Sequence, residues 1–407
     1  MNRLSAILAL GLLCPSLAAL AQDYGTGFTT DGYYRVRNVA TGRYIYVTDN
    51  KDYYSAERED FQAIQLWKDA ASAADGKSPI SSPASVIYIR QVGSKFDLTS
   101  QGTGVHALTG YYVSVDKKSN GTYEVSASVS SSGVEVTKYL SDTEKSSTGQ
   151  GCMGTTGTLN YRRWAVDRIE TTHATNYVGI TPTLEAKGKY YQPFYAAFPF
   201  KPASEGMHVY YICLVDSEYA VLREIEGEVP AATPVIVECS SSDPSQNRLE
   251  LLTASSGSVS GNKLQGVYFC NGKRRQESVD AYRKFDATSM RVLSQDADGK
   301  LVFTSSTESG LEKVKVTDYE TLTKITAFCI PANHSFLRCD ATTAAELTVL
   351  TEEEYKGVGI EDLVAESDRK GVRGVFTLSG QMLRETNDTR GLPAGVYVVG
   401  EHTITIQ

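Results

Sequence analysis

Short stretches of alternating apolar and polar residues fill the first part of the chain. They occur in neighbouring pairs with turn residues between them, as in β-hairpins. The pairs are 31–39 with 44–47, 86–89 with 95–98, and 111–115 with 122–125, and 161–166 would supply a closing strand. Phe61, Ile64 and Trp67 follow a helical spacing, which predicts one or two helical turns within 57–67. The pattern predicts an all-β domain over residues 24–170.

The rest of the chain continues the β pattern after a connector at 173–188. Short apolar runs bounded by turn residues recur at 209–215, 220–225, 234–239, 266–270, 290–293, 300–304, 327–330 and 335–338. Short strands with frequent turns predict a sandwich or barrel-like β region over 171–355. The charged stretch that follows predicts a linker at 356–370 with a short helical piece, and alternation then resumes in a small C-terminal β-sandwich at 371–407.

Residues 1–21 carry the three parts of a secretory signal. Arg3 supplies a positive charge, Leu4 to Leu13 is an apolar run, and Ala19-Leu20-Ala21 has the small residues of a cleavage site. We therefore predict cleavage between Ala21 and Gln22, and a mature chain exported to the extracellular space or the outer-membrane surface. The apolar run is too short for a membrane span, and no second long one follows.

The net charge and the cysteine content bear on nucleic-acid binding and on disulfide formation. The formal net charge of −8 argues against nucleic acid, because binding phosphate needs a basic surface. One of the seven cysteines, Cys14, lies in the signal. The other six are Cys152, Cys213, Cys239, Cys270, Cys329 and Cys339. An even count in an oxidising compartment permits disulfides, while buried free thiols are an equal alternative.

Two sequence motifs follow one another near the C-terminus. Val375 to Leu383 has a strand, a Gly turn and a strand, and Leu392 to Val399 follows as Leu-Pro-Ala-Gly-Val-Tyr-Val-Val. Gly359 to Asp362 stands before them. The order resembles the C-terminal sorting domains of the type IX secretion system in Bacteroidetes. That resemblance implies that residues 371–407 engage secretion machinery; a small terminal sandwich that merely caps the protein is the alternative.

The N-terminal and central regions carry two further resemblances. Gly32 to Val47, followed by Gln65-Leu66-Trp67, is similar to the opening hairpin and Q-x-W phrase of ricin-like β-trefoil domains, and Arg162-Arg163-Trp164 keeps the Trp of a later Q-x-W. This implies a β-trefoil-like domain at 24–170. Three central phrases resemble a β module recurrent in secreted Bacteroidetes proteins, which implies a fold class and no reaction. They are 229–237, 262–268 and 330–337.

No catalytic, metal-binding or cofactor motif occurs, so the sequence predicts no catalytic residue, no metal and no cofactor, and leaves the binding residues unknown. Tyrosines are frequent and often adjacent, as at 33–34, 111–112, 190–191 and 210–211. Adjacent residues in a strand point to opposite faces, so one ring of each pair is expected outward, where it could stack on a sugar. We therefore expect a binding protein for glycans or host-surface ligands. The alternatives are a polysaccharide hydrolase or accessory subunit, and a structural surface protein.

Overall fold

β-Strand dominates the chain in the computed structural model, which describes residues 27–48, 64–69, 79–102, 112–142, 151–154, 159–268, 284–307, 310–318, 323–357, 373–377, 381–400 and 402–406. Strands account for 49% and helices for 7%, so the predicted all-β class is confirmed. The predicted signal and its cleavage point at Ala21 and Gln22 lie outside the described residues.

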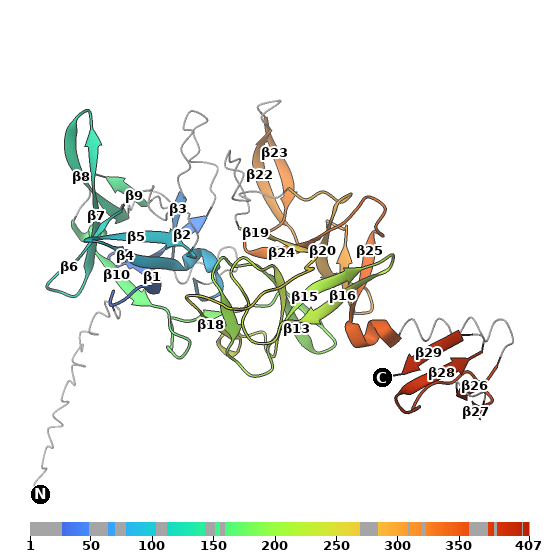
Figure 1. The fold of residues 1–407 in the computed structure, drawn as a ribbon. Helices are drawn as coiled ribbons and strands as arrows, with labels where there is room; N and C mark the ends of the chain where they lie inside the picture. The colour runs from blue at the N-terminus through green and yellow to red at the C-terminus, as the bar shows by residue number, and fades with distance from the viewer. Residues whose placement is uncertain are drawn as a thin grey trace, which may run out of the picture.

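Six strands of the N-terminal region pair into a closed ring (Figure 1). They are β1 (Gly32–Asn38), β4 (Ile87–Val92), β5 (Lys95–Ser100), β6 (Ser114–Lys117), β7 (Tyr123–Ser131) and β10 (Trp164–Arg168). β1 pairs with β4 and β10, and β4 pairs with β5. A bridge between Phe96 and Val113 ties β5 to the start of β6, β6 pairs with β7, and β7 meets β10 at Tyr123–Trp164. A closed ring removes the exposed edges of a sheet. The three predicted hairpins are confirmed, and so is the closing strand from Trp164 onward, whereas Tyr161 and Arg162 lie in a 3-10 turn before it.

Four more strands extend from this ring. They are β2 (Arg43–Thr48), β3 (Ile64–Asp69), β8 (Val134–Asp142) and β9 (Gly151–Gly154). β3 pairs with β2 along its whole length, so the helical turn predicted at 57–67 is wrong over its described part, Ile64 to Trp67. The reason is that strand pairing covers the edge of β2, and three residues of helical spacing are weak against a full ladder of hydrogen bonds. Residues 57–63 lie outside the described residues.

The ring encloses a core built around Trp164, which has no exposed surface. Its indole N–H donates to the carbonyl of Leu140 on β8 at 3.1 Å, so the polar end of the ring is satisfied. Tyr34, Val36 and Ile89 belong to the same cluster. Trp164 of the Q-x-W resemblance is therefore a core residue, and the side chain of Trp67 lies outside the described residues.

A ten-stranded sheet organises the central region. In spatial order it contains β12 (Leu184–Ala186), β13 (Lys189–Phe194), β17 (Val235–Cys239), β15 (His208–Val215), β16 (Tyr219–Glu224), β25 (Glu346–Thr351), β21 (Leu301–Thr304), β20 (Met290–Gln295), β24 (His334–Arg338) and β19 (Leu264–Val267). β25 enters between β16 and β21 and runs parallel to β16. All other pairings in the sheet are antiparallel, so this late strand joins two halves that are otherwise built from hairpins and meanders.

Smaller elements complete the central region. β11 (Val178–Gly179), β18 (Arg248–Leu251) and β14 (Phe200–Pro202) form a three-stranded sheet, and β22 (Glu312–Asp318) pairs with β23 (Thr323–Cys329) as a hairpin. Short 3-10 turns lie at η2 (Pro79–Ser81), η3 (Pro83–Ser85), η4 (Leu159–Arg162) and η5 (Pro244–Gln246). Cys213, Cys239, Cys329 and Cys339 have free thiols, so no bridge forms among the four cysteines described with side chains. Burial raises the pKa of Cys239 to about 12.

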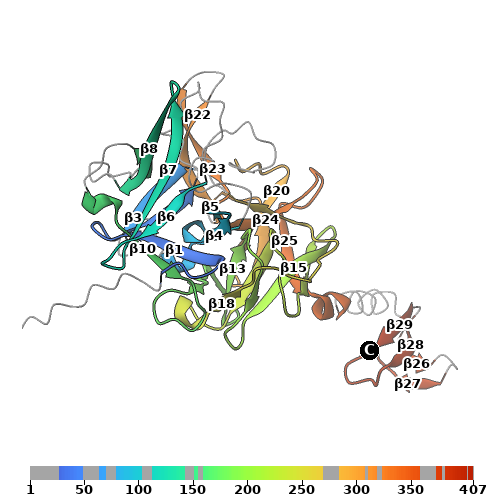
Figure 2. The ribbon, with the colours of Figure 1, turned by 60° about the vertical axis from the view of Figure 1, so that its left-hand side comes forward.

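The N-terminal and central regions lie side by side (Figures 1 and 2), and their hydrophobic clusters contain residues from both. Tyr33 and Val86 belong to a cluster formed mainly by the central region, whereas Tyr268 of the central region belongs to the core of the ring. Arg35, on the same face of β1 as Tyr33, donates to the side chain of Asn176 at 2.7 Å. It also donates to the carbonyls of Tyr177 at 2.8 Å and Pro79 at 3.0 Å. The first strand is therefore packed on both faces.

The C-terminal residues form a small sheet with its own core. A helical turn at 352–357 follows β25, and residues 358–372, which include most of the predicted linker, lie outside the described residues. The sheet has the order β27 (Met382–Arg384), β26 (Val375–Thr377), β28 (Gly395–Val399) and β29 (His402–Ile406). Val375, Tyr397, Val399 and Ile404 form its core. The β pattern predicted for 371–407 is confirmed for the described residues.

Candidate ligand-binding site

Two histidines, His173 and His334, make hydrogen bonds within local turns and to neighbouring strands. His173 accepts the backbone N–H groups of Thr175 and Asn176 in a turn. His334 lies 2.9 Å from the carbonyl of Ala332 and 2.9 Å from the side-chain nitrogen of Gln192. Among the residues with described positions, no group of three or more metal-ligating side chains comes together.

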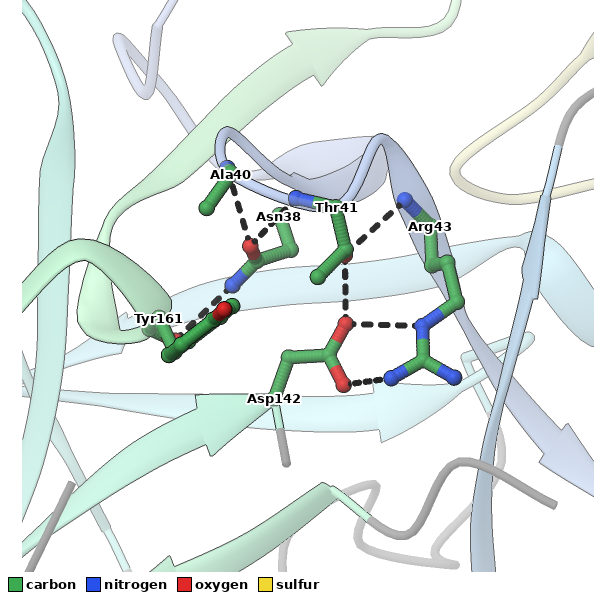
Figure 3. Close-up of polar contacts among 6 residues, drawn as sticks. All are labelled: Asn38, Ala40, Thr41, Arg43, Asp142 and Tyr161. Carbon is green, nitrogen blue, oxygen red and sulfur yellow. Dashed lines mark hydrogen bonds and ion pairs between the residues drawn. The ribbon is translucent and has the colours of Figure 1, made fainter. Parts of the chain in front are cut away.

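A polar group in the N-terminal region surrounds Asp142 at the end of β8 (Figure 3). Its carboxylate accepts from the Thr41 hydroxyl at 2.5 Å and from Nε of Arg43 at 2.9 Å, and it forms an ion pair with the same guanidinium. Asn38 continues the group by accepting from the backbone N–H of Ala40 at 3.0 Å and donating to the carbonyl of Tyr161 at 2.8 Å. Because the Asp142 side chain is fully buried, these contacts fix the β1–β2 turn and present no acceptor to a ligand.

The tyrosines of the four Tyr-Tyr pairs differ in how far they are exposed to solvent. Tyr33 and Tyr34 are 7% and 0% exposed, so the expectation that one of the two points outward is wrong. The cause is that β1 has a hydrophobic cluster on each face. Tyr112 is 52% exposed and Tyr111 lies outside the described residues. Tyr190, Tyr191 and Tyr210 are half-buried, whereas Tyr211 is buried.

Tyr191 and Tyr210 converge on one carboxylate, that of Glu238. Strand register sets Tyr191 on β13 directly opposite Glu238 on β17, and Glu238 opposite His208 on β15. Tyr210 lies two residues after His208 and therefore on the same face. The Tyr191 hydroxyl donates to Oε2 of Glu238 at 3.1 Å, and Lys189 Nζ lies 2.8 Å from Oε1. Glu238 is only 8% exposed.

A second carboxylate lies at the solvent side of this group. Glu224 on β16 is the register partner of Tyr210, and its Oε1 lies 2.7 Å from Nδ1 of His208. The His208 ring stacks with that of Tyr210 at a centroid distance of 6.2 Å. We name Lys189, Tyr191, His208, Tyr210, Glu224 and Glu238 the Tyr–Glu cluster. It joins aromatic rings and carboxylates from four neighbouring strands on one sheet face.

Nearby carboxylates make the electrostatic potential negative at the two tyrosine hydroxyls of the Tyr–Glu cluster. Burial raises the pKa of Tyr191, and the charge of Glu238 adds to it. Burial likewise raises the pKa of Tyr210, with Glu238 and then Glu224 as further causes. Both hydroxyls therefore stay protonated at physiological pH and remain hydrogen-bond donors. Half-buried rings next to acceptor carboxylates can take a ligand with an apolar face and donor groups at its rim.

Sequence reasoning named Tyr191 and Tyr210 among many tyrosines but not their polar partners. Lys189, His208, Glu224 and Glu238 stand in no motif, and only the register of four strands brings them together. The alternation in 234–239 placed Glu238 in a strand, which was the one available signal.

Comparison with known proteins adds no family. No protein-family model matches the chain, and no curated protein matches it. Among the residues that the structure describes, no helix has the length and apolar character to cross a membrane.

Proposed function

We propose that the chain is an exported binding protein that recognises glycans through the Tyr–Glu cluster. The observation that carries the proposal is the pair of half-buried rings, Tyr191 and Tyr210, that flank the buried carboxylate of Glu238. A pyranose ring has an apolar face and a rim of hydroxyls. The tyrosine rings offer a surface for the apolar face, and the carboxylate and phenol groups offer partners for the hydroxyls.

We also propose a trefoil-like fold for the N-terminal domain and a sandwich-like fold for the central region. A ring of six strands with hairpins at β2–β3 and β8–β9 supports a trefoil-like N-terminal domain. The strand order of the central sheet, with a separate three-stranded sheet beside it, supports a sandwich-like central region. In this arrangement the N-terminal ring packs against the central region as a support, and the central sheet presents the ligand surface.

Binding to a glycan array tests the proposal, using the chain from Gln22 with wild-type sequence, Tyr210→Ala and Tyr112→Ala. Tyr210→Ala is expected to lower the affinity for the most tightly bound glycan about 10-fold, because one stacking ring is lost. Tyr112 is an exposed tyrosine outside the cluster, so its variant should bind as the wild type does. Equal losses in both variants, or no glycan bound by any form, would reject the proposal.

The enzyme alternative rests on the two carboxylates Glu224 and Glu238, since a pair of carboxylates is what glycoside hydrolysis requires. Both are already engaged, Glu224 with His208 and Glu238 with Lys189 and Tyr191. This favours binding over hydrolysis. Release of reducing ends from a polysaccharide panel, lost in Glu224→Gln, would favour the enzyme instead.

Export is the second part of the proposal. Amino-terminal sequencing of the exported protein is expected to begin at Gln22. A chain ended after residue 357 keeps β25 and its helical turn but lacks 371–407, and it is expected to fold and remain in the periplasm. The separate core of the small sheet supports this modular reading. Equal surface display of the full and shortened chains would reject an address function.

A further inference from the structure

The charges around the two tyrosines restrict the glycans that the Tyr–Glu cluster can accept, if the proposed function holds. We propose that the cluster prefers glycans with a free primary amino group, and that Lys189 occupies the ammonium position in the unliganded protein. The preference for a cation follows from the surrounding carboxylates, and the role of Lys189 follows from its geometry.

Three carboxylates act on the two rings. Glu238 and Glu354 contribute to the field at Tyr191, and Glu238 and Glu224 contribute at Tyr210. A carboxylated or sulfated sugar would face this field with a like charge. An ammonium group would instead be attracted to the carboxylates and to the negative faces of the tyrosine rings.

Lys189 already makes the contact expected of such a ligand. Its Nζ lies 2.8 Å from Oε1 of Glu238, and its side chain is 50% exposed, whereas that of Glu238 is 11% exposed. The lysine can therefore leave toward solvent, but the carboxylate cannot. The half-exposed lysine recovers its hydration when it moves into solvent, so its own displacement costs little.

Leaving Glu238 without a charged partner is the larger cost. A buried carboxylate that loses a donor pays the desolvation of its charge. A ligand ammonium replaces Lys189 with an equivalent charged donor. A neutral N-acetyl group offers only an amide N–H, which is a weaker partner for a carboxylate than an ammonium. The exchange therefore favours the amine over its acetylated form.

Titration calorimetry with two matched probes tests this inference: a glucosamine hexamer and its fully N-acetylated counterpart. Wild-type protein is expected to bind the amine form about 5-fold more tightly, a difference that added salt reduces. Lys189→Met removes the internal competitor, so the affinity for the amine form should rise about 3-fold while that for the acetylated form stays unchanged. Glu238→Gln should abolish the preference.

Lys201→Met is the control for loss of a lysine charge, because Lys201 pairs with the exposed carboxylate of Glu250 at 3.2 Å on another sheet. It should change neither affinity. Equal affinity of the wild type for both probes, or no gain in Lys189→Met, overturns the amine inference. If Tyr210→Ala still loses glycan binding in that case, the proposed function stands without it. If neither probe nor any array glycan binds, the proposed function itself fails.

Discussion

The same dipeptide, Tyr-Tyr, has different surroundings in β1 and in β15. In β1 both rings are buried, because Tyr34 packs into the core of the ring and Tyr33 into the core shared with the central region. In β15 Tyr211 is buried, whereas Tyr210 is half-buried at the edge of a core and meets carboxylates. Alternation along a strand therefore assigns two faces, but it does not say which face is covered. The covering comes from elements distant in sequence.

The largest expected difference between the two strands is in stability. Tyr34→Ala removes a fully buried ring and its hydroxyl, which donates to the Thr30 carbonyl at 2.5 Å. We expect a loss of about 3–5 kcal/mol in the free energy of unfolding, as for other large-to-small changes in a core. Tyr210→Ala should cost less than about 1.5 kcal/mol, since a half-buried ring leaves no closed cavity. Urea unfolding followed by tryptophan fluorescence measures both, and equal losses would contradict the comparison.

The second prediction concerns the outer face of β1, where Arg35 joins the two regions. Arg35→Met leaves the carbonyls of Pro79 and Tyr177 and the Asn176 side chain without this donor. We expect a loss of about 3 kcal/mol, because unsatisfied buried acceptors are costly. Arg223→Met is the matched control: its side chain is 50% exposed and its partner Glu352 is 38% exposed, so its variant is expected to unfold at nearly the same urea concentration as the wild type.

The same contacts predict the stability of residues 24–170 as an isolated fragment. That fragment lacks Asn176 and Tyr177 and exposes Tyr33 and Val86. It is therefore expected to unfold at a lower urea concentration than the whole chain. Unfolding of the fragment at the same urea midpoint as the whole chain would show that the shared core contributes nothing to the ring.

The smallest expected effect on stability is at Tyr355, which ties the helical turn at 352–357 to the central sheet through Asp216. Its hydroxyl donates to Asp216 at 2.6 Å, which raises the pKa of Tyr355. Burial opposes ionisation of Asp216, but hydrogen bonds from Tyr355 and two backbone N–H groups outweigh it and lower its pKa. Arg223 lowers the pKa of Glu352 on the same helical turn.

A depressed carboxyl pKa stabilises the folded state above the unfolded pKa, near pH 4, and that contribution disappears as the pH falls through the folded value. The helical turn at 352–357 should therefore loosen below about pH 4, while the main core persists. Hydrogen exchange of residues 351–357 measures this. Tyr355→Phe should loosen the turn already at pH 7 and weaken the pH dependence. Unchanged exchange between pH 7 and pH 3 in the wild type would contradict it.

Local patterns predicted the elements whose partners are close in sequence. The hairpins β1–β2, β4–β5 and β6–β7 all have short turns, so alternation and turn residues were sufficient. The hairpin β7–β8 was not predicted, although Ser132 and Gly133 adopt positive φ at its turn, because its strands are rich in polar residues. β25 was missed as well, since its charged neighbours resemble a linker and its partners are remote.

The candidate site followed the same division. Sequence could nominate tyrosines as ligand surfaces, because residue type alone suggests stacking. It could not select Tyr191 and Tyr210, since that requires the register that sets Glu238 between β13 and β15. Nor could it recognise Lys189 as the partner of Glu238, because the two residues are adjacent only across strands.

The position of β25 has a consequence for the timing of folding. Tyr219 of β16 pairs with Thr348 of β25, which is synthesised much later. Neither β16 nor β21 can complete its pairing before β25 is present. Until residues 346–351 have been synthesised, β16 and β21 each have an unpaired edge in the central sheet. A strand from another copy of the chain can pair with such an edge, so a chaperone that holds the growing chain would protect this step most. The N-terminal ring closes by a similarly remote pairing, since Tyr34 of β1 pairs with Arg168 of β10.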